Sequence, residues 1–127
     1  MNRCILFFDD DPEILLVCKI ILEQDNYRVE TRTRCDNIIE DIKEVKPGLI
    51  LMDVWIPEIG GEQAIHLMKD NKETQHLPVI LFSANAEIEE ICQRSNANGF
   101  LKKPFDVIAL KKIIEENIVV PSGNVLN

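Results

Sequence analysis

Four groups of polar residues each follow a short apolar run, and their side chains are of the types that bind metal ions and phosphate. In chain order they are Asp9-Asp10-Asp11 after residues 4–8, Asp53 after 48–52, Ser83 after 78–82, and Lys102-Lys103-Pro104 after 99–101. Gathered carboxylates repel one another unless a cation or protons offset their charge. Oxygen ligands open to water suit Mg²⁺, which favours one or two carboxylates together with a phosphate. A hydroxyl and an ammonium group would hold phosphoryl oxygens, so the set predicts a site for a metal ion and one phosphoryl group.

Each of these residues taken alone has a more ordinary explanation. An Asp at a strand end is usually a cap or turn residue, a Ser there is usually a turn hydroxyl, and a lone Lys is usually solvated. We expect Asp11 to cap the helix that follows it, because Pro12 suits a first helical turn. Lys102 should face away from Lys103 and be solvated, since neighbouring strand residues point to opposite faces. The predicted site therefore depends on a fold that brings the other groups to one edge.

Apolar runs alternate five times with helical patterns along the chain. The expected strands are residues 4–8, 27–33, 48–52, 78–82 and 99–101, and the expected helices are residues 12–25, 36–46, 61–70, 87–95 and 105–118. This order predicts an α/β fold, a (βα)5 doubly wound parallel five-stranded sheet with helices on both faces. The run at 27–33 alternates apolar and polar residues, as an edge strand does. In the common strand order 2-1-3-4-5, the first and third strands are neighbours, which places Asp9 or Asp10 beside Asp53.

Length and composition restrict the class of protein. The 127 residues fit one domain, which we expect to span residues 1–120, with a short C-terminal tail at 121–127 that contains Pro121 and Gly123. A net charge of −8 makes direct nucleic-acid binding a poor prediction. No apolar run is long enough to cross a membrane, and the start lacks the pattern of a signal peptide. The four cysteines lack CxxC spacing, which favours reduced thiols in a cytoplasmic protein.

The first expected helix has apolar residues on more than one side. Steps of 100° gather one apolar sector that should face the core, made of Ile14, Leu15, Val17, Cys18, Ile21 and Leu22. Leu16 and Ile20 fall outside this sector and are four residues apart, so they should form one exposed pair. An exposed apolar pair beside the acidic group is a candidate contact surface for a partner protein.

Four segments of the chain resemble the signature segments of the response-regulator receiver domains of two-component signalling systems, the CheY-like family. They are CILFFDDDPEI at 4–14, LILMDVWIPEIGG at 49–61, PVILFSA at 78–84 and NGFLKKPF at 98–105. Their order and spacing cover nearly the whole chain. The resemblance implies a flavodoxin-like fold and a signalling switch that is phosphorylated on an aspartate.

The resemblance also implies roles for individual residues. Asp53 matches the phosphoacceptor, which also touches the metal, Mg²⁺ or Mn²⁺. Asp10 matches the acid that binds the metal directly, and Asp9 supports it. The backbone carbonyl of Trp55 matches a further metal ligand.

Three more residues match positions that act on the phosphoryl group. Ser83 matches the hydroxyl that grips it, although Thr is more usual there, and Lys103 matches the pairing lysine. Phe100 matches the aromatic switch residue, where Tyr is also common. The donor would be a sensor histidine kinase or a histidine phosphotransfer protein. The output would be a downstream protein or self-dimerisation through the face made by the fourth helix (87–95), the fifth strand (99–101) and the fifth helix (105–118).

Two other interpretations fit parts of the same pattern. In a phosphatase of the haloacid-dehalogenase type, Asp9 would be the nucleophile and Asp9-x-Asp11 the opening motif. That scheme has Glu13 where a small hydroxyl residue is expected, no room for a cap domain, and no role for Asp53. An inert scaffold of receiver shape would usually lack an acid or the lysine, and this chain lacks neither.

Overall fold

The computed structural model describes residues 3–119, which form five strands and five helices in strict alternation. The strands are β1 (Cys4–Phe8), β2 (Arg28–Arg32), β3 (Leu49–Asp53), β4 (Val79–Ser83) and β5 (Gly99–Lys102). The helices are α1 (Pro12–Glu23), α2 (Ile38–Val45), α3 (Gly60–Lys69), α4 (Ile88–Ser95) and α5 (Val107–Asn117). Every predicted element is present, with ends that differ from the prediction by at most two residues. The predicted tail at 121–127 lies outside the described residues.

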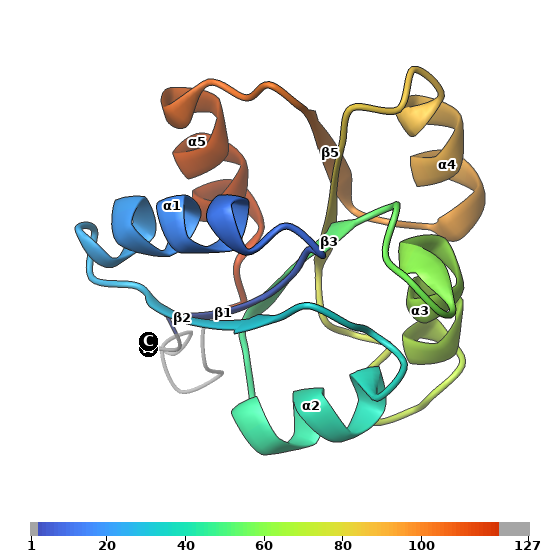
Figure 1. The fold of residues 1–127 in the computed structure, drawn as a ribbon. Helices are drawn as coiled ribbons and strands as arrows, with labels where there is room; N and C mark the ends of the chain where they lie inside the picture. Colours follow the sequence, from blue (N-terminus) through green and yellow to red (C-terminus); the bar gives the residue numbers. More distant parts are fainter. Residues whose placement is uncertain (1–2, 120–127) are drawn as a thin grey trace.

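All five strands are parallel and lie in the order β2-β1-β3-β4-β5 (Figure 1). This is the predicted order, with the break in sequence order between β1 and β3. β2 is an edge strand, as its alternating pattern indicates, with Val29 buried and Arg28 exposed. The α/β fold of the CheY-like type is therefore confirmed.

Helices cover both faces of the sheet and bury its side chains in two separate cores. α1 and α5 lie on one face, and α2, α3 and α4 lie on the other (Figure 1). Alternate residues of β1 divide between the two cores, with Phe7 on the α1–α5 side and Phe8 on the other. β1, β3 and β4 are buried along their whole length, as expected of central parallel strands.

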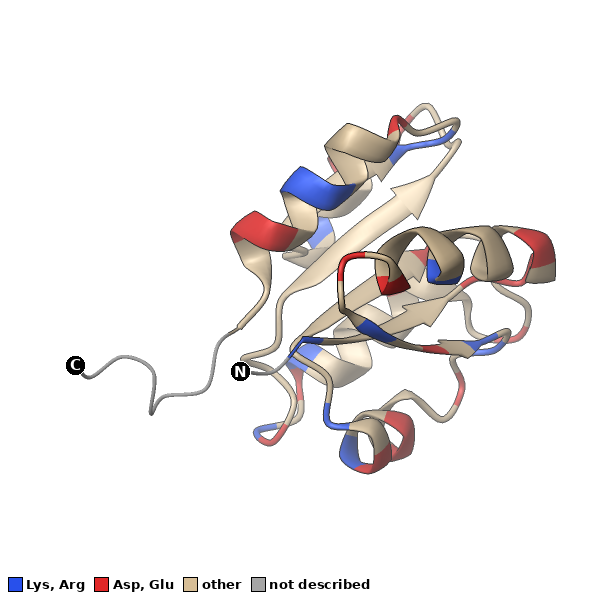
Figure 2. Ribbon diagram, turned by 90° about the vertical axis from the view of Figure 1, so that its left-hand side faces the viewer, with Lys and Arg blue, Asp and Glu red and all other residues tan. Residues whose placement is uncertain are grey.

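Charged residues are distributed over the helices and their connections, with basic and acidic positions interspersed (Figure 2). Many of them pair locally, and Arg32 of β2 lies within 4 Å of Glu30, Asp41 and Glu44. In residues 3–119, no helix is both long enough and apolar enough to cross a membrane.

Helix α1 begins and packs largely as its sequence predicts. Asp11 is its N-cap, accepting a hydrogen bond from Glu13 N at 2.9 Å, and Pro12 stands in the first turn. Leu16 and Ile20 are exposed, as expected. The prediction for Val17 was wrong, because its side chain is exposed rather than in the core. Only a narrow stripe of α1 reaches the sheet, and Val17 lies past the edge of that stripe, beside Ile20.

Helix α3 approaches the sheet so closely that one position in its first turn has no room for a side chain. A Cβ atom at Gly61 would lie 1.9 Å from the carbonyl oxygen of Asp53, the last residue of β3. The N–H of Gly61 donates to the carbonyl oxygen of Val54 at 2.9 Å. Glycine is thus required here for packing, and it fixes α3 against the strand end that carries Asp53.

Replacing Gly61 with Ala should therefore destabilise the fold. We expect the free energy of unfolding to fall by about 2 kcal/mol or more, because the added methyl group must push α3 away from β3. Urea unfolding would measure the loss. Gln63→Ala in the same helix is the matched control, since Gln63 is exposed, and equal stability of both variants would contradict the steric argument.

Candidate phosphorylation and metal site

The carboxyl ends of β1 and β3 bring three aspartates together. Phe8 of β1 pairs with Met52 of β3, so Asp9 and Asp10 emerge beside Asp53. One carboxylate oxygen from each of the three residues lies within 4.8 Å of the other two. Asp9 and Asp53 are buried and Asp10 is exposed, so the group opens to solvent on the Asp10 side. The placement of Asp9 or Asp10 beside Asp53, predicted from strand order, is confirmed, and both acids lie there.

Asp9 is committed to structural contacts through both of its oxygens. Its Oδ1 accepts a hydrogen bond from Asp11 N at 2.9 Å, and its Oδ2 accepts one from Lys103 Nζ at 2.8 Å. The side chain has no exposed surface. Asp9 therefore orients the start of α1 and the lysine, and it is badly placed to attack a substrate.

Lys103 directly follows the edge strand β5, and its side chain reaches the same carboxylates from there. Its Nζ lies 2.8 Å from Asp9 Oδ2 and 3.2 Å from Asp53 Oδ1. The ammonium group also lies 5.0 Å from the centre of the Phe82 ring, within the range of a cation–π contact. Lys102, its neighbour, is exposed as predicted.

One aromatic ring contacts this lysine and two further rings pack against that ring, and the sequence pattern did not predict this group. Phe82 packs edge-to-face on Phe7, with ring centres 5.4 Å apart, and on Phe105, with centres 5.2 Å apart. Phe7 and Phe82 precede predicted site residues by one or two positions, but nothing in their pattern separates them from ordinary core residues. The contact of Phe82 with Lys103 depends on the path of the chain after β5.

Burial and mutual repulsion shift the ionisation of this site. Burial raises the pKa of Asp53 from 3.8 to about 6, and the Asp9 charge adds to the rise, while Lys103 acts against it. For Lys103, burial opposes the charge, but the hydrogen bond to Asp9 and the attraction of Asp53 outweigh burial and raise its pKa. The single ammonium group thus leaves part of the carboxylate repulsion in place. This site favours the arrival of another cation.

The donor set fits a divalent cation that prefers oxygen ligands. Carboxylates are its usual protein ligands, and the exposed side at Asp10 leaves room for bound water. Trp55, whose backbone carbonyl was predicted to contribute, stands two residues beyond Asp53 with its side chain 67% exposed. The cluster of Asp9, Asp10 and Asp53 can therefore hold a metal ion.

Ser83 ends β4 at the same edge of the sheet and is buried. Its Oγ accepts a hydrogen bond from Asn85 N at 3.0 Å, and Asn85 Oδ1 accepts one from Glu87 N at 2.7 Å. Asn85 thereby links the serine to the residue before α4. The sequence shows a signal for this role, because an Asn two residues before a helix N-cap can form such a turn, but it does not specify the serine as partner.

Phe100 lies on the same face of the sheet as Ser83. It pairs with Leu81 of β4, two residues before Ser83, and its half-buried ring packs against the core on the α4 side. Its position relative to Ser83 and α4 is compatible with the predicted switch role.

The whole arrangement corresponds to a known family. The family model for the response regulator receiver domain matches residues 5–115. The chain belongs to the response regulator receiver domain family, whose members are phosphoacceptor signalling domains.

Curated relatives agree with this assignment. The nitrogen assimilation regulatory protein NtrX of Azorhizobium caulinodans is 30% identical over 119 residues, which is 91% of this chain but 26% of the relative. The DNA-binding regulator RpaA of Synechocystis is 31% identical over 111 residues, 81% of this chain and 44% of the relative. The response regulator DivK of Brucella ovis is 27% identical over 110 residues, 84% of this chain and 89% of the relative. The chain thus spans less than half of NtrX and RpaA and most of DivK.

Solved structures show the same fold. A putative response regulator from Chloroflexus aurantiacus superposes with a TM-score of 0.85 at 20% identity, covering 91% of this chain and 97% of that one. The receiver domain of the sensor histidine kinase PA1611 from Pseudomonas aeruginosa gives a TM-score of 0.82 at 24% identity, covering 91% and 97%. That protein has a magnesium ion coordinated in its active site cleft.

The raised pKa of Asp53 predicts a cost to stability when no metal is bound. An acid with a higher pKa in the folded state than in the unfolded state destabilises the fold above the folded pKa, and this cost disappears below the unfolded pKa. With EDTA at pH 8, Asp53→Asn should therefore raise the free energy of unfolding by about 1–3 kcal/mol. The gain should shrink as the pH falls from about 6 to 4. Urea unfolding at each pH would measure it.

A matched surface variant separates this effect from a general change in net charge. Glu116→Gln removes one exposed acid from α5 and should change stability little at any of these pH values. The same pH-dependent gain in both variants would contradict a local origin at Asp53.

Proposed function

We propose that this domain is a phosphorylation-dependent switch that receives a phosphoryl group on Asp53 from a histidine kinase or a histidine phosphotransfer protein. The observation that carries the proposal is the juxtaposition of Asp9, Asp10 and Asp53 with the Lys103 ammonium group bound to two of them. Membership of the receiver family supports it. We propose that the domain also binds a divalent ion, Mg²⁺. Its ligands would be Asp10, Asp53 and the Trp55 carbonyl, with Asp9 in support.

The residues around Asp53 would each contribute to transfer. A carboxylate oxygen of Asp53 forms a bond to phosphorus as the bond to the donor imidazole breaks, and the imidazole leaves with the electron pair. Lys103 would then hold a phosphoryl oxygen, because its Nζ already lies 3.2 Å from Asp53 Oδ1. The bound divalent ion would supply further neutralisation of negative charge. Hydrolysis of the acyl phosphate by water returns Asp53 to its free form.

Ser83 and Phe100 would convert phosphorylation into a change of shape. The Ser83 hydroxyl would donate a hydrogen bond to a phosphoryl oxygen and move toward Asp53. Phe100 would then fill the space on the α4 side that Ser83 leaves. The partner would read this change on the face formed by α4, β5 and α5, as a downstream protein or as a second copy of the domain.

Asp53→Asn should abolish phosphorylation of the domain by acetyl phosphate, since the amide cannot form the acyl phosphate. Wild type should gain one phosphoryl group by intact mass in the presence of Mg²⁺ and none with EDTA. Asp10→Asn should weaken Mg²⁺ binding by at least about tenfold. Mapping of the phosphoryl group to Asp9 would instead support the phosphatase interpretation, which the burial and hydrogen bonds of Asp9 disfavour.

The donor protein would dock on the exposed side of α1. Leu16, Val17 and Ile20 are all exposed there and form one apolar stripe, larger than the predicted pair because Val17 joins it. A second apolar surface lies beside the site, where a hollow of about 420 Å³ is lined by Ile14, Ala84, Lys103, Pro104 and Phe105. A helical donor that covered both surfaces would bring its phosphohistidine to Asp53.

Replacing Leu16 and Ile20 with Ser should slow phosphoryl transfer from a cognate protein donor by about fivefold or more and leave labelling by acetyl phosphate unchanged. The small donor needs no docking surface, so it reports whether the site is intact. Leu67→Ser on α3 is the control, because Leu67 is also exposed but lies on the opposite face of the sheet. Equal slowing with both phosphoryl donors would show a damaged site rather than a lost contact.

A further inference from the structure

Helix α4 depends on contacts with its surroundings for its position. It has eight residues, of which Ile88, Ile91 and Ser95 are buried, and no side chain caps its N-terminus. A helix this short is not stable alone in water, so tertiary contacts must hold it. Besides the two buried isoleucines, polar contacts hold it at both ends.

The first end of α4 is connected to the phosphorylation site by a chain of short hydrogen bonds. Ser83 Oγ accepts from Asn85 N, and Asn85 Oδ1 accepts from Glu87 N. The carbonyl oxygen of Asn85 also accepts from Ile88 N at 3.2 Å. A displacement of the Ser83 hydroxyl therefore acts directly on the first turn of α4.

The last turn of α4 is tied to α3 by a forked ion pair. Arg94 Nε lies 2.6 Å from Glu62 Oε2, and Arg94 Nη2 lies 2.9 Å from Glu62 Oε1. This bidentate geometry is the most directional form of an ion pair between side chains. Glu62 directly follows Gly61, whose close contact with Asp53 fixes α3. The bridge thus anchors α4 to a helix that cannot easily move.

We propose that Glu62 and Arg94 are positioning residues that hold α4 in its unphosphorylated place and so oppose phosphorylation of Asp53. The proposal rests on the proposed function, because it needs a phosphoryl group that draws on Ser83. α4 spans only about 12 Å, so a movement imposed on its first turn is carried to its last turn. The planar fork tolerates little displacement, and movement of α4 therefore costs the energy of the bridge.

The test is the affinity for beryllium trifluoride, a phosphoryl mimic, in the presence of Mg²⁺. Isothermal titration calorimetry would compare wild type with Arg94→Gln, which breaks the fork and leaves the contact between Glu62 and His66 at 3.8 Å. The variant should bind the mimic about two- to fivefold more tightly, the range expected of an ion pair that is partly exposed to solvent. The affinity for Mg²⁺ alone should not change, because the bridge does not touch the aspartates.

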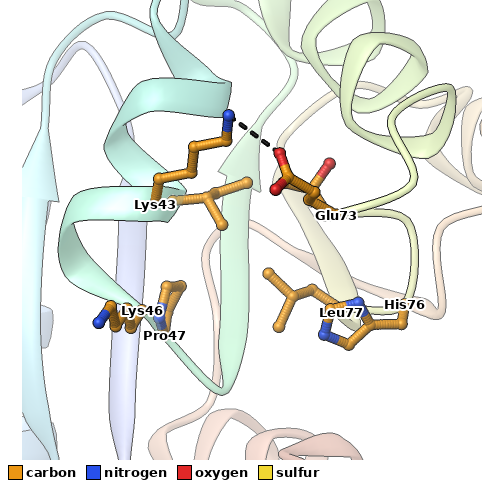
Figure 3. A pocket seen from close by; sticks show the side chains of 8 residues that line it. Lys43, Lys46, Pro47, Glu73, His76 and Leu77 are labelled. Carbon is orange, nitrogen blue, oxygen red and sulfur yellow. Dashed lines mark ion pairs between the residues drawn. The ribbon is translucent and has the colours of Figure 1, made fainter.

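Three further variants separate the bridge from other causes. Arg94→Lys keeps the charge without the fork and should give an intermediate affinity. The double exchange Glu62→Arg with Arg94→Glu should restore an affinity close to that of wild type. Lys43→Gln breaks a different ion pair, Lys43 to Glu73 at 3.0 Å, which spans a hollow at the amino end of the sheet (Figure 3), and should leave the affinity unchanged.

Unchanged or weaker binding by folded Arg94→Gln would overturn the proposal, and so would equal tightening by Lys43→Gln. Thermal unfolding would establish that each variant is folded. If wild type itself does not bind beryllium trifluoride with Mg²⁺, the proposed function fails and the role of the bridge falls with it. Normal binding by wild type and Arg94→Gln alike would refute the bridge alone.

Discussion

The attraction between one lysine and two buried carboxylates is the interaction on which this domain depends. Asp9 and Asp53 stand at the ends of adjacent central strands, where neither is well solvated. Lys103 directly follows the edge strand β5 and donates hydrogen bonds to both carboxylates. It can do so only if β3, β4 and β5 are in register and the chain after β5 turns back over the edge. The contacts that form the site therefore also require the correct arrangement of the strands.

Lys103 offsets only part of the repulsion among the aspartates, and the remaining repulsion favours the binding of a cation. Burial and the neighbouring Asp9 charge outweigh the single ammonium group, so the pKa of Asp53 stays raised. A neutral residue at position 53 would relieve the repulsion, but it would also remove the proposed nucleophile and one of the three carboxylates that could hold a cation. The cost is met by apolar burial, because both faces of β1, β3 and β4 lie in closed cores. At the end of β3, the carboxylate that the proposed chemistry needs therefore lowers the stability of the fold.

The sequence predicted the elements, the sheet order and the aspartate cluster, because these follow from local patterns and from a general rule for parallel sheets. It was wrong for Val17, because helical periodicity does not tell how wide a stripe the sheet covers. It could not show that Gly61 touches Asp53 or that Phe82 supports Lys103, since both depend on distances between elements. The pairing of Glu62 with Arg94 was equally invisible, because 32 residues separate the partners. The roles taken from the family resemblance, such as that of Phe100, remain predictions.

The two ends of the described chain meet far from the site. Gly48, just before β3, donates its N–H to the carbonyl oxygen of Cys4 at 2.8 Å and accepts a hydrogen bond from Val119 N at 3.0 Å. Both connections lie at the amino end of the sheet, whereas Asp53, Ser83 and Lys103 lie at the carboxyl end. The described chain therefore begins and ends at the edge of the sheet that lies opposite the reactive one. Close chain ends on the face away from a site are common in domains, and they keep the chain connections clear of that site.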